Sequence, residues 1–446
     1  MAERYDAVVI GAGPAGEVCG GELADGGMRT AICERQLVAG ECSYWACIPS
    51  KTLLRPGEAV EAARQAPGAR EAVSGKIDPS QAFAWRDFMV SDYDDAGQVK
   101  WLDGKGIDLF RGEARVDGPE RVVVGEETLE TERIVFASGS EPVIPPIDGL
   151  RELEGIWTNR EATGAKAVPE RLIVLGGGPV GVEMGQALAR FGASVAIAES
   201  SDRLLSREAD AAGEKLAEAL EAEGIDLMFG ARANAAARHG NGYSLSFEDG
   251  SELRGDALLV ATGRRPRTEQ LGLDRVEVHL DEGGGIKVDE HLRAGDGLWA
   301  IGDVTGIMPF THVGKYQARI AAADILGRDG NGADYRAVPR VVFTDPQVAA
   351  VGRPGGEREG SVSLASIART STYTREYAER PGLMTLFADD DHLVGAVAVG
   401  PEAGEWLQQA TLAIRAEVPI PVLRDVIQPF PTFSEAFVSA LADLEA

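Results

Sequence analysis

The sequence predicts an α/β protein with two Rossmann-like units and a C-terminal α+β module. Three observations lead to this prediction. Two glycine-rich turns each follow an apolar strand, an acidic residue stands at the same offset behind each turn, and the last hundred residues alternate like strands. At 446 residues the chain is too long for one hydrophobic core, and about three domains are expected.

The first Rossmann-like unit opens at the N-terminus. An apolar run leads into GAGPAG, with Gly11, Gly13 and Gly16, and a second strand at 29–33 ends in Glu34, 23 positions after Gly11. Glycines at such positions let the backbone approach a pyrophosphate, and the start of the following helix favours its charge. The carboxylate at the end of the second strand accepts hydrogen bonds from ribose hydroxyls.

The second unit repeats this pattern. Another apolar run leads into GGGPVG, with Gly176, Gly178 and Gly181, and the strand at 194–198 ends in Glu199, again 23 positions after the first glycine. A single GxGxxG is weak evidence. Two copies with the same strand, helix and acid favour two dinucleotide-binding units over two unrelated packing turns.

The repeat extends beyond the turns. Residues 134–142, IVFASGSEP, resemble residues 258–266, LLVATGRRP, and both indicate a buried strand that ends in a turn of small residues. A further apolar strand ends in Gly302 and Asp303 and precedes a helical stretch at 316–326. This strand is expected to return to the first unit.

The last hundred residues change character. PRVVFTDPQVAAVG, SIARTSTYTREY, LMTLFAD and LVGAVAVG alternate like an antiparallel sheet, with helical stretches at 402–416 and 421–426. Such a module after two nucleotide units is a candidate interface domain. We expect the first unit at 1–148, with its continuation at 271–335. The second unit is expected at 149–270 and the interface module at 336–446.

The composition narrows the class of partner. The chain carries 44 basic and 71 acidic residues, and this net charge of −27 disfavours nucleic acid and anionic membranes. No apolar run approaches the roughly 18 residues of a spanning helix, and the N-terminal run reads as a strand and not as a signal peptide. Four cysteines in a chain of this length indicate a reducing compartment, so we expect a cytoplasmic protein.

Two of the four cysteines lie five positions apart in GECSYWACIPSK. Cys42 and Cys47 could be a redox pair, metal ligands or buried thiols, and a metal is disfavoured because no histidine or second CxxC lies nearby. Five residues of regular helix rise about 7.5 Å, whereas a disulfide tolerates a Cα separation of about 7 Å. The backbone must therefore leave the helix between the two cysteines if they bridge, and Pro49 is consistent with that. Cys19 and Cys33 are expected to be inert core thiols.

Eight motifs carry a resemblance to a known family. In chain order they are GAGPAG, CSYWACIPSK, ASGSEP, GGGPVGVE, ATGRRP, AIGDV, VVFTDPQVAAVG and FPTFSE. With them the chain resembles, over its whole length, the flavoprotein pyridine nucleotide–disulfide oxidoreductases, which include dihydrolipoamide dehydrogenase, glutathione reductase and mercuric reductase. The resemblance implies an enzyme with FAD at the first unit, NAD(P)H at the second and a C-terminal domain that closes a homodimer.

The resemblance also implies the residues that bind the cofactors. Those expected at FAD are Gly11, Gly13, Gly16, Glu34, Lys51, Ser138, Gly139, Gly302, Asp303 and His312. Those expected at NAD(P) are Gly176, Gly178, Gly181, Glu199, Gly263 and Arg264.

Catalytic roles follow from the same resemblance. Cys47 is implied as the thiol next to the flavin and Cys42 as the interchange thiol that meets the acceptor. Lys51 is implied near flavin N5, paired with Glu183, and the alternative for these two is an ordinary surface ion pair. Electrons would pass from the nicotinamide to the flavin and through Cys47 to the disulfide, after which Cys42 would attack the acceptor.

One motif departs from the family pattern. Disulfide reductases of this family carry a histidine before the Pro-Thr of the C-terminal motif, whereas here Phe430 stands at that position and Glu435 is kept. None of the five histidines lies in the last 54 residues. The base that would keep Cys42 as a thiolate is therefore missing, and such groups contribute about 10² to 10⁴ in rate. Phe430 suggests an apolar wall at the acceptor site, and His312 is implied on the cofactor side.

Three functions are compatible with these residues. The first is an FAD-dependent reductase of a small disulfide-type acceptor, which the cysteine pair favours. The second is an NAD(P)H reductase of a quinone, a metal ion or another electron acceptor, which Phe430 favours. The third is a non-catalytic flavoprotein component of a complex. Glu199, followed by two serines where an NADPH enzyme often carries basic residues, favours NADH, although Arg203 is close.

Overall fold

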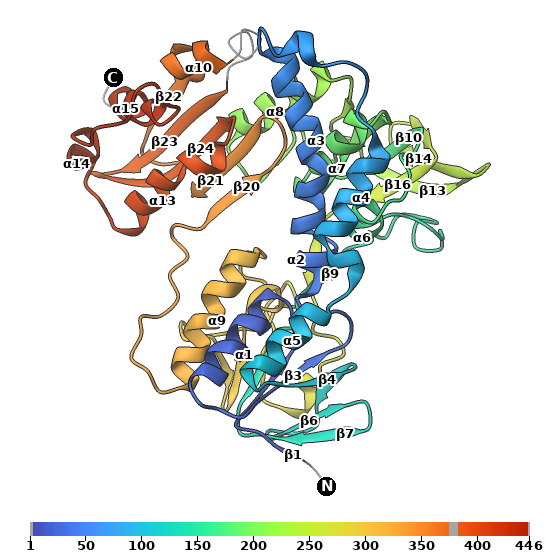
Figure 1. Ribbon diagram of the computed structural model, residues 1–446, viewed down its shortest axis with the longest axis vertical. Helices are drawn as coiled ribbons and strands as arrows, with labels where there is room; N and C mark the ends of the chain where they lie inside the picture. The colour runs from blue at the N-terminus through green and yellow to red at the C-terminus, as the bar shows by residue number, and fades with distance from the viewer. Residues whose placement is uncertain (1–2, 374–381, 445–446) are drawn as a thin grey trace. The chain divides into compact units, whose positions relative to one another are not determined.

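The computed structural model describes residues 3–373 and 382–444. Contacts within the chain divide it into two compact units, and Figure 1 labels many of their helices and strands. The first unit consists of Met1–Pro49, Arg86–Val143 and Gly263–Asp334, and the second of Ser50–Trp85, Ile144–Thr262 and Tyr335–Ala446. Within these described ranges, no helix is both long and apolar enough to cross a membrane.

The first unit is built on a six-stranded sheet with the order β18-β19-β8-β2-β3-β4, parallel except for the pair β18–β19. The central strands are buried throughout because helices α1, α5 and α9 lie side by side over the sheet (Figure 1). The bounds are β2 (Ala7–Ile10), β3 (Thr30–Glu34), β4 (Asp108–Arg111), β8 (Ile134–Phe136), β18 (Arg293–Gly295), β19 (Leu298–Ala300), α1 (Pro14–Asp25), α5 (Ala96–Lys105) and α9 (Thr311–Ile325).

Smaller pieces complete the first unit. A four-stranded sheet has the order β1-β7-β6-β5, and β9 pairs with β17 in a short antiparallel ribbon. Their bounds are β1 (Glu3–Arg4), β5 (Ala114–Val116), β6 (Arg121–Val124), β7 (Glu127–Glu130), β9 (Ser140–Pro142) and β17 (Arg264–Pro266), with short helices α2 (Gly40–Tyr44), η2 (Ser91–Tyr93), η3 (Leu273–Arg275) and η4 (Gly302–Thr305).

The second unit contains the second Rossmann-like sheet. Its parallel strands have the order β12-β11-β10-β16, beside a three-stranded antiparallel sheet β13-β14-β15. The bounds are β10 (Arg171–Leu175), β11 (Ser194–Ala198), β12 (Asp226–Met228), β13 (Ala233–His239), β14 (Gly242–Phe247), β15 (Glu252–Gly255), β16 (Ala257–Val260), α6 (Asn159–Thr163), α7 (Pro179–Arg190) and α8 (Asp210–Ala222). Along the chain, α3 (Cys47–Gln65) and α4 (Pro79–Met89) each begin in one unit and end in the other.

The C-terminal module also belongs to the second unit. Its antiparallel sheet has the order β20-β21-β24-β23-β22, and a cluster of buried apolar residues joins this sheet to the C-terminal helices. The bounds are β20 (Pro339–Val342), β21 (Gln347–Gly352), β22 (Arg358–Ser363), β23 (Leu383–Asp389), β24 (His392–Gly400), α10 (Ala368–Tyr373), α12 (Ala403–Trp406), α13 (Gln408–Arg415), α14 (Ile420–Arg424) and α15 (Glu435–Asp443).

The structure confirms the α/β class and corrects two elements. The segment SIARTSTYTREY, expected as a strand, forms the helix α10 where it is described, because Ile367 and Thr370 are buried and Thr370 Oγ1 donates to the carbonyl of Leu364 at 2.6 Å. Its last four residues lie outside the described ranges. Helix α9 begins at Thr311, five residues before the helical stretch read from the sequence, and this shift brings Thr311 into the site.

Candidate active site

The first glycine-rich turn has the geometry of a pyrophosphate cradle. Gly11 has a φ of 107°, and a Cβ there would lie 2.3 Å from the carbonyl oxygen of Ala137. A Cβ on Gly16 would lie 1.9 Å from the carbonyl oxygen of Gly11, so only glycine lets α1 pack this closely. Gly13 is the N-cap of α1, and nothing lies within 4 Å of the position its Cβ would take. The turn therefore leaves room for an anion at the start of α1.

The second turn repeats this geometry. Gly176 has a φ of 113°, and a Cβ there would lie 2.5 Å from the carbonyl oxygen of Ala261. A Cβ on Gly181 would lie 2.0 Å from the carbonyl oxygen of Gly176. Gly178 is the N-cap of α7 and has the same open surroundings as its counterpart in the first turn. Both turns fit a dinucleotide on backbone geometry.

The acids behind the two turns are held alike. Glu34 Oε2 accepts a hydrogen bond from Ala12 N at 2.8 Å, and Glu199 Oε2 accepts one from Gly177 N at 2.7 Å. Burial opposes ionisation of Glu199, but hydrogen bonds from the backbone amides of Ser201 and Gly177 outweigh it and lower its pKa. The Glu199 side chain is thus an oriented carboxylate suited to ribose hydroxyls.

Asp303 follows the strand that returns to the first unit. Its Oδ2 accepts a hydrogen bond from Ser140 Oγ at 2.6 Å, and the preceding Gly302 donates its N–H to Gln317 Oε1 at 2.6 Å. These contacts fix the carboxylate at the carboxyl edge of the parallel sheet, where ligands of such sheets bind. Ser140 and Gln317 are positioning residues that the sequence analysis did not identify.

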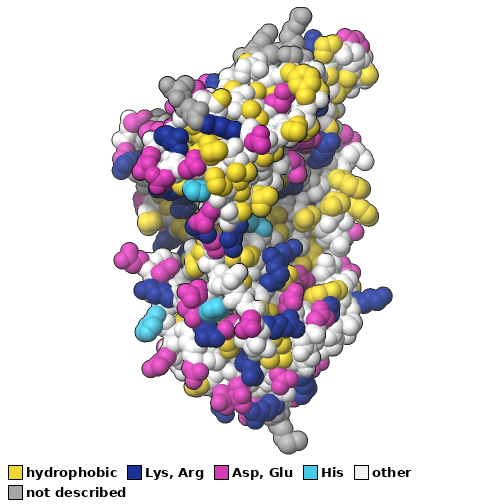
Figure 2. Space-filling model, turned by 90° about the vertical axis from the view of Figure 1, so that its left-hand side faces the viewer, with side chains coloured by type: hydrophobic (Ala, Val, Ile, Leu, Met, Phe, Trp, Pro, Cys, Tyr) yellow, Lys and Arg dark blue, Asp and Glu magenta, His cyan; other side chains and the backbone are white. Residues whose placement is uncertain are grey.

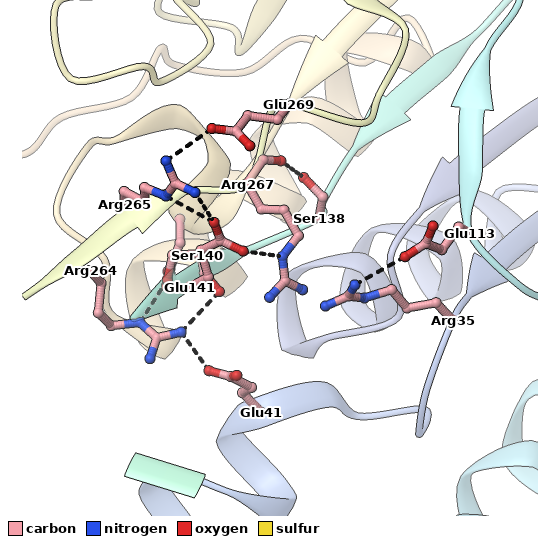
Figure 3. Close-up of polar contacts among 11 residues, drawn as sticks. Arg35, Glu41, Glu113, Ser138, Ser140, Glu141, Arg264, Arg265, Arg267 and Glu269 are labelled. Atoms are coloured by element: carbon pink, nitrogen blue, oxygen red, sulfur yellow. Dashed lines mark hydrogen bonds and ion pairs between the residues drawn. The ribbon is translucent and has the colours of Figure 1, made fainter. Parts of the chain in front are cut away.

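Arg264 joins β17 to the segment before the cysteine pair (Figure 3). Its Nε donates to Ser140 Oγ at 2.8 Å, and its Nη2 donates to Ser140 O at 2.9 Å and to Glu41 Oε2 at 2.5 Å. Glu41 immediately precedes Cys42. The role of Arg264 and Gly263 at NAD(P) stays a prediction, and the sequence did not predict this contact with α2.

Further polar contacts hold β9 against β17 (Figure 3). Arg265 Nε and Arg267 Nε donate to the two oxygens of Glu141 at 2.8 and 3.4 Å. Ser138 Oγ donates to the Arg267 carbonyl at 2.8 Å, and Arg267 N donates to the carbonyl of Gly139 at 3.0 Å. Partly exposed ion pairs of this kind add little stability. They fix the register of the ribbon that carries Ser140 and Arg264.

The backbone leaves the helix between the two cysteines, which are both free thiols here, and a disulfide between them would require this break. Cys42 lies in α2, which ends at Tyr44. The following residue, Trp45, has a non-helical φ of −136° and ψ of 4°, and α3 begins at Cys47. Pro49 is the third residue of α3, in the first turn, where a missing N–H costs nothing. The break therefore comes from the end of α2 and not from Pro49.

A single hydroxyl contacts both sulfur atoms. Thr311 Oγ1 donates to Cys42 Sγ at 3.0 Å and lies 3.4 Å from Cys47 Sγ. The adjacent sulfur of Cys47, together with burial, raises the pKa of Cys42. His312, the next residue in α9, stacks on Phe310 with ring centroids 5.4 Å apart. The two thiols are therefore close neighbours at the start of α9.

The other two cysteines differ from this pair. Cys19 on α1 and Cys33 on β3 are buried, and burial raises the pKa of each to about 12. Such thiols stay protonated and unreactive at neutral pH. Their packing agrees with the expectation that they are core residues.

Lys51 and Glu183 form a partly buried ion pair within the second unit. Lys51 Nζ lies 2.7 Å from Glu183 Oε2, and Glu183 is only 4% exposed. The other oxygen of Glu183 accepts the N–H of Phe343 at 2.9 Å, and Lys51 Nζ lies 4.7 Å from the centre of the Phe343 ring. The carboxylate is buried and hydrogen-bonded at both oxygens, whereas the Lys51 side chain is 35% exposed, so the pair is half-buried and its catalytic role stays a prediction.

Phe430 is exposed in the described chain, whereas two nearby phenylalanines are not. Phe433 and Phe437 belong to the core of the C-terminal module, while Phe430 is 75% exposed and Ile427 is 94% exposed. Hydrophobic side chains gather over this module in Figure 2. Glu435 opens α15 beside them. Contiguous exposed apolar patches mark surfaces that partners cover, and Ile427 and Phe430 are candidates for such a patch.

A pocket of about 300 Å³ lies over α1, between α5 and α9. Glu17 and Lys315 line it together with Pro14, Val18, Gly21, Glu22, Asp25, Trp101 and Lys105. Burial raises the pKa of Glu17 from its ordinary value of 4.5 to about 7, although Lys315 acts in the opposite direction. The fold thus binds a proton at Glu17 more tightly than the unfolded chain does.

The raised pKa of Glu17 predicts that the free energy of unfolding falls as the pH rises. Because the pKa of Glu17 is higher in the folded than in the unfolded chain, protonation of Glu17 favours the fold. This contribution is fully present below about pH 4.5 and is lost as the pH rises through about 7. Relative to Glu17→Gln, the wild type should lose about 1 to 3 kcal/mol of unfolding free energy between pH 5 and pH 8. Thermal unfolding of both proteins at the two pH values measures this, and a difference in Tm that is independent of pH would contradict it.

Two dinucleotide cradles and a pair of adjacent thiols define a class of protein, an oxidoreductase that uses two nucleotide cofactors and a dithiol. The family model described as pyridine nucleotide-disulphide oxidoreductase matches residues 5–318, and the model of its dimerisation domain matches residues 338–441. The chain belongs to this family. Its members depend on FAD and take electrons from NAD(P)H.

Similar proteins span most of the chain. A mercuric reductase of Acidithiobacillus ferrooxidans is 35% identical, and the match covers 96% of this chain and 80% of the reductase. A dihydrolipoyl dehydrogenase of Thermus scotoductus is 33% identical, and the match covers 98% of this chain and 97% of the dehydrogenase. Among solved structures, the Cu(II) complex of the HOCl-induced flavoprotein disulfide reductase RclA from Escherichia coli has a TM-score of 0.87 and 27% identity, and covers 99% of both chains. LpdA from Mycobacterium tuberculosis has a TM-score of 0.86 at 27% identity, with 100% of both chains covered.

Proposed function

We propose that this protein passes electrons from NAD(P)H, through bound FAD and the Cys42–Cys47 pair, to a small disulfide-type acceptor. One observation carries the proposal. Thr311 Oγ1 contacts both Sγ atoms, at 3.0 and 3.4 Å, so the two sulfurs lie close together at the start of α9. Inert structural thiols such as Cys19 are fully buried, whereas both members of this pair keep some exposure.

The residues of the first unit suit a flavin site. When bound, FAD supplies the hydride-accepting chemistry and the electron pair that reduces the disulfide. The turn that begins at Gly11 would hold its pyrophosphate, Glu34 its ribose and Asp303 its ribitol. Cys42 would then form a bond to one acceptor sulfur as the acceptor disulfide breaks and its other sulfur leaves as a thiolate. Cys47 would attack the Cys42 sulfur and expel the bound acceptor sulfur as the second thiolate, which restores the protein disulfide.

Lys51 and Glu183 are retained as proposed catalytic residues. The carboxylate accepts from Lys51 Nζ and from a backbone N–H, so both of its oxygens are occupied and the ammonium is held in one place. A fixed cation of this kind would stabilise negative charge on the reduced cofactor. The resemblance of the motifs around both residues supports this role.

The proposed partner is a second copy of this chain. The match to the dimerisation domain supports a homodimer, and the exposed side chains of Ile427 and Phe430 lie in that domain. We infer that the two subunits share each acceptor site, with Phe430 and Glu435 supplied across the interface. The reducing chemistry of the pair fits the cytoplasm as the place of action.

A second candidate acceptor is a quinone or a metal ion. The observation that favours it is Phe430, an apolar side chain at the position where the family's disulfide reductases carry a base. The structural neighbour RclA, a flavoprotein disulfide reductase, has been solved as a Cu(II) complex. An acceptor that takes electrons without a protonated leaving thiol would not need the missing histidine.

The choice of nucleotide is the first prediction of this proposal. The ionised side chain of Glu199 should accept both ribose hydroxyls of NADH and repel the 2′-phosphate of NADPH. We expect kcat/KM for NADH to exceed that for NADPH about tenfold or more, and Glu199→Ser to reduce the ratio. Steady-state kinetics with both nucleotides measure it, and a wild-type preference for NADPH would refute it.

An acceptor panel tests the proposed function. The FAD-loaded dimer is supplied with NADH and, in turn, with small symmetrical disulfides, a soluble quinone and Cu(II), and turnover is compared with that of Cys47→Ser. Disulfide reduction that disappears in Cys47→Ser supports the proposal. Turnover with the quinone or Cu(II) but none with any disulfide would replace it with the second candidate.

A further inference from the structure

We propose that Thr311 is a catalytic residue whose hydroxyl transfers a proton between Cys42 and Cys47 in the reduced pair. The inference rests on the proposed function, because it concerns the same two thiols. It answers a question that the departure at Phe430 raises. A dithiol that must form a thiolate at Cys42 needs a group that takes up the proton, and the family's histidine is not in this sequence.

The hydrogen bonds around Thr311 define a path for that proton. A threonine hydroxyl has one proton to donate and lone pairs that accept. Its proton points to Cys42 Sγ at 3.0 Å, which leaves a lone pair of the hydroxyl to accept from the Cys47 thiol at 3.4 Å. Cys47 also forms a direct hydrogen bond with Cys42, so the hydroxyl offers a second path beside that direct contact. The two contacts form a chain from Cys47 S–H through Oγ1–H to Cys42 Sγ. Reversing both bonds moves one proton from one sulfur to the other without changing the charge of the pair.

The position of Thr311 in the fold favours a thiolate at either sulfur. Thr311 is the first residue of the 15-residue helix α9, and the start of a helix carries a partial positive charge that stabilises a nearby thiolate. Lys315 lies one turn further along α9, and its charge lowers the pKa of Cys42, as does the hydrogen bond from Thr311. Glu17 of α1 lines the same pocket as Lys315. Among the described residues, Lys315 is the charged side chain whose charge acts on Cys42.

The adjacent Cys47 sulfur and burial oppose this stabilisation, because together they raise the pKa of Cys42. Two thiols coupled in this way titrate as a pair, and the state in which they hold a single proton is the one that reacts here. In the step proposed here the shared proton moves through Oγ1 to Cys47. The Cys42 thiolate then forms a bond to an acceptor sulfur, and the acceptor disulfide breaks.

The second half of the reaction restores the pair. The Cys47 proton passes to the first acceptor thiolate, and the Cys47 thiolate attacks the Cys42 sulfur and expels the second acceptor thiolate. A proton from water completes the second acceptor thiol. The acceptor gains two electrons and two protons, and the dithiol loses two electrons and one proton while it becomes a disulfide.

Thiol alkylation tests the inference without any acceptor. The FAD-loaded protein is reduced with dithiothreitol, and the rate at which iodoacetamide modifies Cys42, located by peptide mass spectrometry, is followed from pH 6 to 10. In Thr311→Val, which keeps the shape but loses the hydroxyl, the rate at pH 7 is expected to fall about tenfold and the profile to move to higher pH. Thr311→Ser should stay within about twofold of the wild type.

A matched control and a second variant complete the test. Thr131→Val removes a buried hydroxyl of the same unit that bonds only to backbone groups, and it should not change the profile. If Thr311→Val does not retain flavin, Thr311→Ala takes its place. The inference would be overturned if the wild type and the variant without a hydroxyl gave superimposed alkylation profiles. It would also be overturned if Cys42 of the serine variant were alkylated as slowly as that of the valine variant. Failure of NADH to reduce the pair would instead remove the proposed function, and the alkylation profiles would be unaffected.

Discussion

Replacing Cys42 by serine is expected to lower turnover of a small disulfide about 10³-fold or more, while reduction of a one-electron dye such as ferricyanide by NADH stays within about threefold. A serine hydroxyl is not ionised at neutral pH and cannot exchange with a disulfide. Electron transfer to the dye does not require the interchange thiol. Steady-state kinetics with both acceptors measure the two effects separately.

The contrast between the two acceptors makes the Cys42 result specific. Cys19→Ala removes a buried thiol of the same unit outside the pair and should leave both rates unchanged. A loss of both activities in Cys42→Ser would indicate damage to the cofactor site and not loss of a nucleophile. Full disulfide turnover in Cys42→Ser would show that the pair does not carry electrons to the acceptor.

Changing Phe430 to histidine is expected to raise turnover of small disulfides about tenfold or more near pH 7.5. Positioned acid–base groups contribute about 10² to 10⁴ in rate, and a newly placed imidazole should recover part of this. Glu435 already occupies the position of the glutamate that accompanies the histidine in the resembling family. The activity of the variant should also acquire a dependence on pH near the histidine pKa of about 6.5.

Phe430→Gln is the matched control, because glutamine is polar and fills similar space but does not titrate in this range. It should not raise disulfide turnover. A rise in both variants would indicate that polarity, and not a base, limits the wild type. No rise in Phe430→His, together with a loss of quinone or Cu(II) turnover, would favour the second candidate acceptor.

The parts of the fold that local sequence specifies were predicted well. The glycine turns and the two acids are set by a short stretch of chain each, since only glycine tolerates φ near 110° and the close approach of α1 or α7. The buried positions of Cys19 on α1 and Cys33 on β3 follow from the first of these motifs. The division into four segments stays a prediction, as do the roles of the individual cofactor residues.

Contacts between distant segments could not be predicted. Thr311 meets the cysteine pair because α9 begins earlier than its apolar pattern indicates, and no local feature of MPFTHVGKY marks that start. Glu41 meets Arg264 across more than two hundred residues, through pairing of β9 with β17. The helix α10 formed where alternating threonines suggested a strand, because tertiary burial of Ile367 and Thr370 outweighed propensity.

The most direct test of the central claim is an anaerobic reductive titration of the FAD-loaded protein with NADH. If Cys42 and Cys47 form a working redox pair, each subunit takes up two equivalents of reductant, and a long-wavelength absorbance band appears as the thiols are formed. Uptake of a single equivalent per subunit, with no such band, would contradict the account.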